Sequence, residues 1–186
     1  MSNASPQVTI PARITAADLA KAIGRDVSQV QAVMTARGEP DSPDDVLDGL
    51  LATEAARALG VEVAVEPRDL ALERLYESES RFRDEPTVDL PTRVERLVSG
   101  VLEASEALDE KIEGASQHWS VARMPMIDRA ILRLGLWELI NDTDTPTAVI
   151  VSEAVRLANT YSTGRSGSFI NGVLATLAKS VREDAT

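Results

Sequence analysis

The sequence of 186 residues contains no cysteine, one histidine and only 3% aromatic residues. The absence of cysteine excludes disulfides, thiolate nucleophiles, zinc-thiolate sites and iron-sulfur clusters, so nothing ties the chain to an oxidising compartment. No apolar run reaches the roughly 20 residues that a membrane helix needs. The polar first residues also lack the basic and apolar regions of a signal peptide. We therefore expect a cytoplasmic protein that has no membrane partner.

Basic residues are outnumbered along the whole chain, because 19 Lys and Arg stand against 30 Asp and Glu and give a net charge of −11. Residues 1–66 carry 5 basic and 10 acidic groups, and residues 67–186 carry 14 and 20. A general binder of nucleic acids needs clustered Lys and Arg, whose contacts with phosphate release counterions. The composition excludes this class, and RNA binding would require a local patch or a basic partner.

The sequence lacks the essential residues of several common catalytic sites. The sequence has no Gly-Lys-Ser or Gly-Lys-Thr of a phosphate loop and no Gly-x-Gly-x-x-Gly of a dinucleotide site. Serine catalysis needs a base, but His118 is interpreted as a capping or surface residue, and Gly164–Ser168 misses the nucleophile-elbow spacing by one residue. Asp44, Asp45 and Asp48 favour stabilisation of a helix start over a calcium site. We expect no enzyme, no cofactor and no metal.

Apolar residues recur at spacings of three and four along nearly the whole chain, which predicts an all-α fold. In the first part, Thr15 is a candidate N-cap and Gly38 a candidate helix stop. The segment Val61–Glu66 alternates apolar and acidic residues, which predicts an extended strand or a linker. We place the domain boundary there, between a small three-helix module (1–66) and a larger helical bundle (67–186). The helices predicted for the module cover residues 16–23, 26–38 and 43–60.

In the second part, a single apolar stripe predicts one long helix from Val94 to Ile112. The segment Ile127–Ile140 is apolar on more than one face, which predicts a central helix that is covered on most sides. Glu138 within it is then a buried carboxylate, which must be paired or protonated. We favour a structural pair over a functional acid, and the candidate partners are Arg129, Arg133 and Arg156.

The segment Tyr161–Phe169 has features of a binding loop. It combines small and hydroxyl residues with one cation, Arg165, and a helix is predicted to begin directly after it. Helix N-termini and free backbone amides attract phosphate, and aromatic rings stack on unpaired bases at roughly 1 to 3 kcal/mol each. In the alternative interpretation, Tyr161 and Phe169 anchor their helices in the core.

The motifs on both sides of this loop resemble the NusB family of bacterial transcription antitermination proteins. They are Ala71–Tyr76, Asp128–Leu134, Trp137–Leu139, Ser152–Val155 and Ser166–Leu174, and the resemblance covers about residues 68–183. It implies an all-helical adaptor without catalytic activity. Such an adaptor binds the boxA element of ribosomal RNA leaders as single-stranded RNA, pairs with the ribosomal protein NusE, and acts in the antitermination complex of RNA polymerase.

The resemblance also implies roles for individual residues. The RNA-facing surface would contain Arg68, Tyr161, Arg165, Ser166 and Phe169. Tyr76 and Asp128 would lie toward NusE, and a carboxylate there suits a basic partner. The family usually carries an Arg-rich run before its first helix, whereas Val63–Arg68 retains a single Arg. This departure predicts weak RNA binding by the chain alone.

Residues 1–66 resemble the N-terminal domain of bacterial translation initiation factor 2, which implies a tether or docking module without chemistry. The resemblance depends on Ile14–Thr15, Asp18–Ala20, Val30, Met34, Gly38, Ala55–Ala56 and Leu59–Val63. Two alternative functions stay open for the whole chain. One is a protein-interaction scaffold of the NusB fold that has lost RNA binding. The other is a regulatory subunit of a ribosomal RNA methyltransferase, because NusB-like domains also precede such enzymes.

Overall fold

The computed structural model describes residues 8–80, 91–116 and 120–182. The chain divides into two compact units, the first ending at Leu70 and the second beginning at Ala71. Most of the described residues are helical, which confirms the helical fold class. Within the described ranges, no helix is both long enough and apolar enough to cross a membrane.

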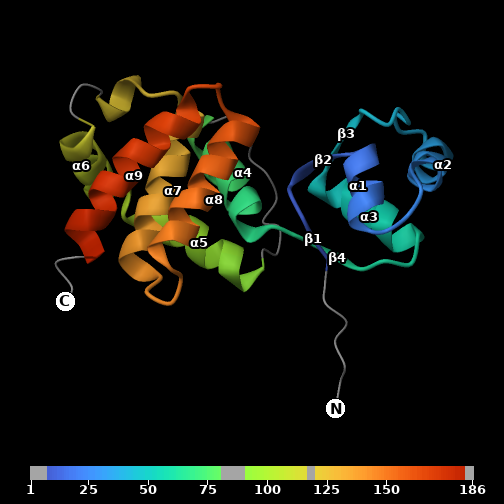
Figure 1. Ribbon diagram of the computed structural model, residues 1–186, viewed down its shortest axis with the longest axis horizontal. Coiled ribbons are helices and arrows are strands. Elements are labelled where there is room, and N and C mark those ends of the chain that lie inside the picture. Colours follow the sequence, from blue (N-terminus) through green and yellow to red (C-terminus); the bar gives the residue numbers. More distant parts are fainter. Residues whose placement is uncertain (1–7, 81–90, 117–119, 183–186) are drawn as a thin grey trace, which may run out of the picture. The chain divides into compact units, whose positions relative to one another are not determined.

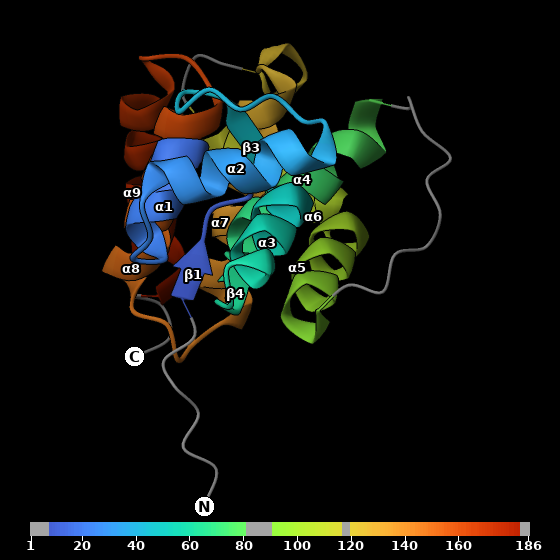
Figure 2. The ribbon, with the colours of Figure 1, turned by 90° about the vertical axis from the view of Figure 1, so that its right-hand side faces the viewer.

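The first unit contains short strands that the helical periodicity did not reveal. β1 (Val8–Ile10) pairs in parallel with β4 (Val63–Val65), and β2 (Arg13–Thr15) pairs antiparallel with β3 (Val46–Asp48). Figure 2 shows β1 and β4 side by side. The extended conformation expected within residues 61–66 is confirmed, but the segment is a strand of the first unit and not a linker. Strands of three residues are too short for an alternating pattern to identify.

The helices of the first unit are α1 (Ala16–Ala22), α2 (Val27–Arg37) and α3 (Gly49–Ala58). The Thr15 cap is confirmed, because its Oγ1 accepts a hydrogen bond from the backbone N of Asp18 at 3.1 Å. Gly38 ends α2 in the left-handed conformation with a φ of +74°, as expected. The third helix begins at Gly49 and not near residue 43, because β3 occupies the residues before it.

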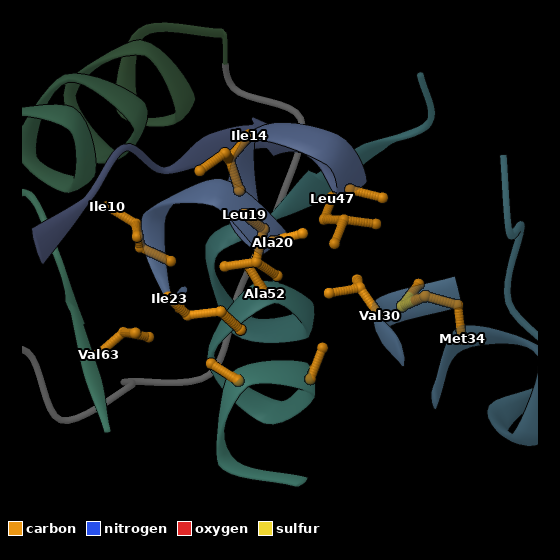
Figure 3. Packing of buried hydrophobic residues seen from close by; sticks show 13 residues of the cluster. Ile10, Ile14, Leu19, Ala20, Ile23, Val30, Met34, Leu47, Ala52 and Val63 are labelled. Atoms are coloured by element: carbon orange, nitrogen blue, oxygen red, sulfur yellow. The ribbon is translucent and has the colours of Figure 1, made fainter. Parts of the chain in front are cut away.

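One apolar core joins the strands and the helices of the first unit (Figure 3). Ile10 of β1 and Val63 of β4 belong to the same buried cluster as Leu19 of α1 and Met34 of α2. Burying one such side chain contributes roughly 1.5 to 3 kcal/mol. The core therefore holds the short strands in place, although an isolated pair of three-residue strands would not be stable.

The second unit is a helical bundle built around α7. Its helices are α5 (Thr92–Glu103), α6 (Ser105–Ala115), α7 (Met126–Asn141), α8 (Thr147–Tyr161) and α9 (Ser166–Arg182), with the 3₁₀ helix η1 (Val121–Arg123) between α6 and α7. α4 (Pro67–Ser80) begins in the first unit and continues into the second. α7 packs against α5, α6, α8 and α9 (Figure 1), and most of its residues are buried. The expectation of a central helix is confirmed.

The long helix expected from Val94 to Ile112 is wrong, because the chain bends at Ala104. This residue ends α5 and precedes α6, with a φ of −95° and a ψ of 5°. Buried residues on both sides of the bend, such as Val101 and Leu108, belong to helices that pack on α7. The apolar stripe therefore continues through the bend, so the periodicity alone does not reveal the break.

Prolines stand directly before two helices of the second unit. Pro125 and Pro146 are the N-cap residues of α7 and α8. His118 lies outside the described residues. Its interpretation as a capping or surface residue stays a prediction.

Candidate nucleic-acid interface

Four polar side chains meet beneath the turn between α8 and α9. Asp128, in the first turn of α7, accepts hydrogen bonds from Ser162 Oγ at 2.6 Å and from Ser166 Oγ at 2.9 Å. Ser166 Oγ also lies 3.0 Å from Ser162 Oγ and 2.9 Å from Thr163 Oγ1. We call Asp128, Ser162, Thr163 and Ser166 the corner cluster. It connects both sides of the α8–α9 turn to the central helix.

Asp128 and Ser166 form the buried part of the corner cluster, whereas Ser162 is half-buried and Thr163 is exposed. Asp128 is 4% exposed and Ser166 is 3% exposed, so neither side chain offers much surface to a ligand. A buried carboxylate is tolerated when it accepts hydrogen bonds, and the start of α7 adds a favourable helix dipole. α9 also packs closely against α8 at Gly167, where a Cβ would lie 2.3 Å from Asn159 Oδ1. The chain accommodates this approach of α9 to α8 by having glycine at residue 167.

The outer side of the same turn carries the loop cation. Arg165 and Gly164 are exposed, and Tyr161 and Phe169 are half-buried at the two ends of the loop. The two rings are therefore neither core anchors nor free surface groups, which leaves part of each residue accessible. α9 begins at Ser166 and not after Phe169 as expected, so Phe169 lies in its first turn. Helix starts present backbone amides that lack partners within the helix. The turn thus combines a cation, accessible aromatic residues and a helix N-terminus.

Arg129, the residue after Asp128, anchors the end of α4. Its Nη2 donates to Glu79 Oε2 at 2.8 Å, and its Nη1 donates to the backbone O of Val121 at 3.2 Å. Consecutive residues of α7 therefore hold two different segments, the α8–α9 turn and the C-terminal end of α4. Tyr76 lies one turn before Glu79 on α4 and is 43% exposed.

One helical turn further along α7, Arg133 extends this ion-pair network. Its Nε and Nη2 donate to the two carboxylate oxygens of Asp109 in α6, each at 2.7 Å, and Nη1 pairs with Glu79. The hydrogen bonds to Asp109 and the nearby negative charges raise the pKa of Arg133 above its ordinary value, against the opposing effect of burial. The network is suited to holding helices together and carries no feature of a catalytic site.

The matches to known proteins agree with this bundle. A family model described as the NusB family matches residues 57–179. The chain belongs to the NusB family. A protein of Leifsonia xyli subsp. xyli named transcription antitermination protein NusB is 39% identical over 130 residues, which cover 69% of this chain and 90% of the relative. Its namesake in Pseudarthrobacter chlorophenolicus is 46% identical over 121 residues, or 59% of this chain and 88% of the relative.

Solved structures are also similar to this chain. NusB of T. maritima is 30% identical with a TM-score of 0.57, over 63% of this chain and 92% of that structure. A chain in a crystal structure described as a plectonemic RNA supercoil is 27% identical with a TM-score of 0.55. The match covers 61% of this chain and 92% of that chain. The NusB family match begins within α3, so most of the first unit lies outside it. The resemblance of residues 1–66 to initiation factor 2 stays a prediction.

The structure brings together most of the site residues that the NusB resemblance implied. Arg165, Tyr161 and Phe169 share the α8–α9 turn, whereas the side chains of Ser166 and Asp128 lie inside it. Arg68 belongs to the first unit, is 6% exposed, and has its Nη1 3.7 Å from Glu66 Oε1. Within the described ranges, no group of three or more His, Cys, Asp or Glu residues is arranged to hold a metal ion.

Sequence reasoning did not find every residue that shapes this interface. Glu79 and Ser162 carried no recognisable signal, because their partners on α7 lie 50 and 34 positions away in the chain. A carboxylate in the first turn of an apolar helix was the one hint in the sequence. Glu138 is buried as expected, at 1% exposure, and its Oε1 lies 4.0 Å from Arg93 Nη2, a partner that the sequence did not indicate.

Proposed function

We propose that this chain is a cytoplasmic transcription antitermination factor that binds boxA-type single-stranded RNA together with the ribosomal protein NusE, within the antitermination complex of RNA polymerase. Family membership supports the proposal, because the curated relatives bear the name of an antitermination protein and not of an enzyme. The observation that carries it is Arg165, exposed on the α8–α9 turn between two half-buried aromatic residues.

The proposed RNA contacts follow from the chemistry of this turn. Arg165 offers a cation to a backbone phosphate, and Tyr161 and Phe169 offer rings on which unpaired bases stack. The N-terminus of α9 attracts phosphate through its amides and its dipole. Ser166 contributes as the first residue of α9, since its hydroxyl is bonded to Asp128 and its backbone N donates to Thr163 O. Arg68 has little exposed surface, so a direct contact from it is the least supported member of the set.

A basic partner would offset the electrostatic repulsion between this acidic chain and RNA. The chain has a net charge of −11, which repels RNA except where a positive group is close. In our proposal NusE supplies positive charge and forms a composite surface with the turn. The exposed Tyr76 provides an aromatic ring and a hydroxyl for NusE. The resemblance also implied Asp128 for this side, but its carboxylate is buried and engaged by the corner cluster, so we propose no direct contact of Asp128 with NusE.

The decisive experiment reverses the charge at the loop. We expect Arg165→Glu to weaken binding of boxA RNA by the preformed complex with NusE by about tenfold or more, because a phosphate contact becomes a repulsion. Lys179→Glu is the matched control, since it makes the same charge change on an exposed residue near the other end of α9. NusE affinity should be unchanged in both variants. Equal RNA affinity for Arg165→Glu and the unaltered chain would remove the loop from the RNA site.

One observation favours a second candidate, a NusB-fold scaffold without RNA binding. The segment Val63–Arg68 has one arginine, and that residue is mostly buried. If the unaltered chain binds NusE but the pair binds no boxA RNA at low salt, the scaffold replaces the antitermination factor. Gel-shift titrations with and without NusE at two salt concentrations separate the two.

We also propose that residues 1–66 form a docking module attached to the NusB domain at 67–186. The separate apolar core of the first unit supports an autonomous role for it. Co-purification from cell extract with the full-length chain and with a chain that begins at residue 67 tests this proposal. Partners that are retained by both forms would argue against docking by the module.

A further inference from the structure

Asp128 is buried, whereas a carboxylate that contacts a partner protein would have to be exposed. It is 4% exposed, and among the described residues its side-chain donors are the hydroxyls of Ser162 and Ser166. Each carboxylate oxygen accepts one of these hydrogen bonds, so the two donors lie on opposite sides of the α8–α9 turn. A carboxylate in this arrangement is suited to holding a turn and poorly placed to contact a separate protein.

The residues between Ser162 and Ser166 are held by the corner cluster and by a few local hydrogen bonds, such as those from Ser166 N to Thr163 O at 2.9 Å and from Ser168 Oγ to Arg165 O at 3.0 Å. Gly164 has open space around it, since a Cβ there would meet no atom within 4 Å. Arg165 is exposed and stands between Gly164 and the buried Ser166. The corner cluster contacts the chain before and after this pair through Ser162, Thr163 and Ser166. The hydroxyl contacts of the corner cluster, together with the local hydrogen bonds of the turn, therefore fix the conformation of the exposed pair.

We propose that Asp128 is a positioning residue for RNA recognition, which fixes the α8–α9 turn so that Arg165 and the N-terminus of α9 are presented together. The RNA part of this inference rests on the proposed function, whereas the ordering of the turn does not. Loss of the carboxylate removes the charged acceptor of Ser162 Oγ and of the buried Ser166 Oγ, which is unfavourable and allows the turn to open locally. Binding then has to order the turn again, and affinity falls.

The choice of variants separates positioning from general stability. Ser166→Ala removes the hydroxyl that contacts Asp128, Ser162 and Thr163, and leaves the carboxylate in place. Asp128→Asn keeps one acceptor oxygen and the shape of the side chain, so it should retain part of the effect. Thr176→Ala is the matched control, because its exposed hydroxyl on α9 bonds only within its own helix, to the backbone O of Gly172 at 3.0 Å.

The first experiment measures the turn without RNA. Trypsin cleaves after Arg165, and the rate of this cleavage in the folded full-length chain reports opening of the turn. We expect Ser166→Ala and Asp128→Ala to raise it by about tenfold, Asp128→Asn less, and Thr176→Ala not at all. Cleavage after Lys179 within α9 is the internal reference, because general unfolding accelerates both sites. An unchanged ratio of the two rates in Ser166→Ala would overturn the inference. This test remains available if Asp128→Ala does not fold.

The second experiment measures binding by the same variants. We expect Ser166→Ala and Asp128→Asn to weaken boxA RNA binding in the presence of NusE by about three- to tenfold, with NusE affinity unchanged. A direct contact of Asp128 with NusE predicts the opposite pattern, in which Asp128→Asn weakens NusE binding and Ser166→Ala does not. That result overturns the positioning role. So does unchanged RNA affinity in variants whose turn is opened.

A failure of the proposed function is recognisable separately. If the unaltered chain with NusE binds no boxA RNA, the antitermination proposal fails, and the role of Asp128 in RNA recognition fails with it. The cleavage ratio at Arg165 and Lys179 still decides in that case whether Asp128 orders the turn.

Discussion

Gly100 of α5 lies against the indole of Trp137 in α7 so closely that a Cβ on Gly100 would be 2.4 Å from two ring carbons. The ring belongs to the central helix, and Trp137 is 9% exposed. Glycine in a helix is otherwise unfavourable by roughly 0.5 to 1 kcal/mol relative to alanine. Here the close approach of α5 to α7 outweighs that preference.

Gly100→Ala should therefore destabilise the protein by about 1 to 3 kcal/mol, because the new methyl group overpacks the contact with Trp137. Gly172→Ala is the control, since Gly172 lies inside α9 and a Cβ there would meet no atom within 4 Å. The control should stabilise by up to about 1 kcal/mol through helix propensity. Urea unfolding of both variants measures the difference. Equal effects would mean that the indole moves aside freely.

The ion pair between Glu79 of α4 and Arg129 of α7 provides a second test. Both side chains are mostly buried, with 19% and 17% exposure, and Glu79 also pairs with Arg133. Glu79→Gln should lower the free energy of unfolding by about 1 to 3 kcal/mol, because two guanidinium groups lose a charged acceptor. Glu77→Gln on the same helix is the control. Its more exposed pair with Arg74 should contribute less than about 1 kcal/mol. Similar losses for the two variants, measured by thermal unfolding, would contradict the structural role of Glu79.

The central helix shows what the sequence can determine. Its apolar residues on several faces predict burial, and α7 is indeed buried among four other helices. Helix caps at Thr15 and Gly38 are equally predictable, because they depend on residues close in the chain. The bend at Ala104 is not, since a continuous apolar stripe is compatible with one straight helix or with two.

The candidate interface was likewise predictable from the sequence only where it depends on residues close in the chain. The composition of Tyr161–Phe169 and its resemblance to NusB identified the loop that carries Arg165. Burial of Ser166 and Asp128 depends on a contact across 38 positions, which no local pattern encodes. The pairing of β1 with β4 joins residues 55 positions apart, such as Val8 and Val63, and was missed for the same reason. Long-range contacts thus decide which residues of a recognisable motif face solvent.

Thr15 tests the local part of the first unit. Its Oγ1 accepts a hydrogen bond from the backbone N of Asp18 at the start of α1. Thr15→Ala should destabilise the first unit by roughly 0.5 to 2 kcal/mol, whereas Thr15→Ser keeps the acceptor and should cost much less. Amide hydrogen exchange of α1 measures the effect within the full chain. The cap would be unimportant if alanine and serine gave the same exchange rates.

The salt dependence of RNA binding tests how many phosphates are neutralised by the chain and how many by NusE. For single-stranded nucleic acid, the slope of log K against log salt changes by about 0.7 for each phosphate that a protein neutralises. The chain alone offers few exposed cations at the α8–α9 turn, so we expect a shallow slope without NusE and a steeper one with it. Arg165→Ala should reduce the magnitude of the slope of the NusE pair by about 0.7, while Lys179→Ala leaves it unchanged. Fluorescence anisotropy with labelled boxA RNA between about 50 and 200 mM salt covers the useful range. A slope that is the same for Arg165→Ala and the unaltered chain would show that Arg165 neutralises no phosphate, and the cation of the site would then have to come from NusE.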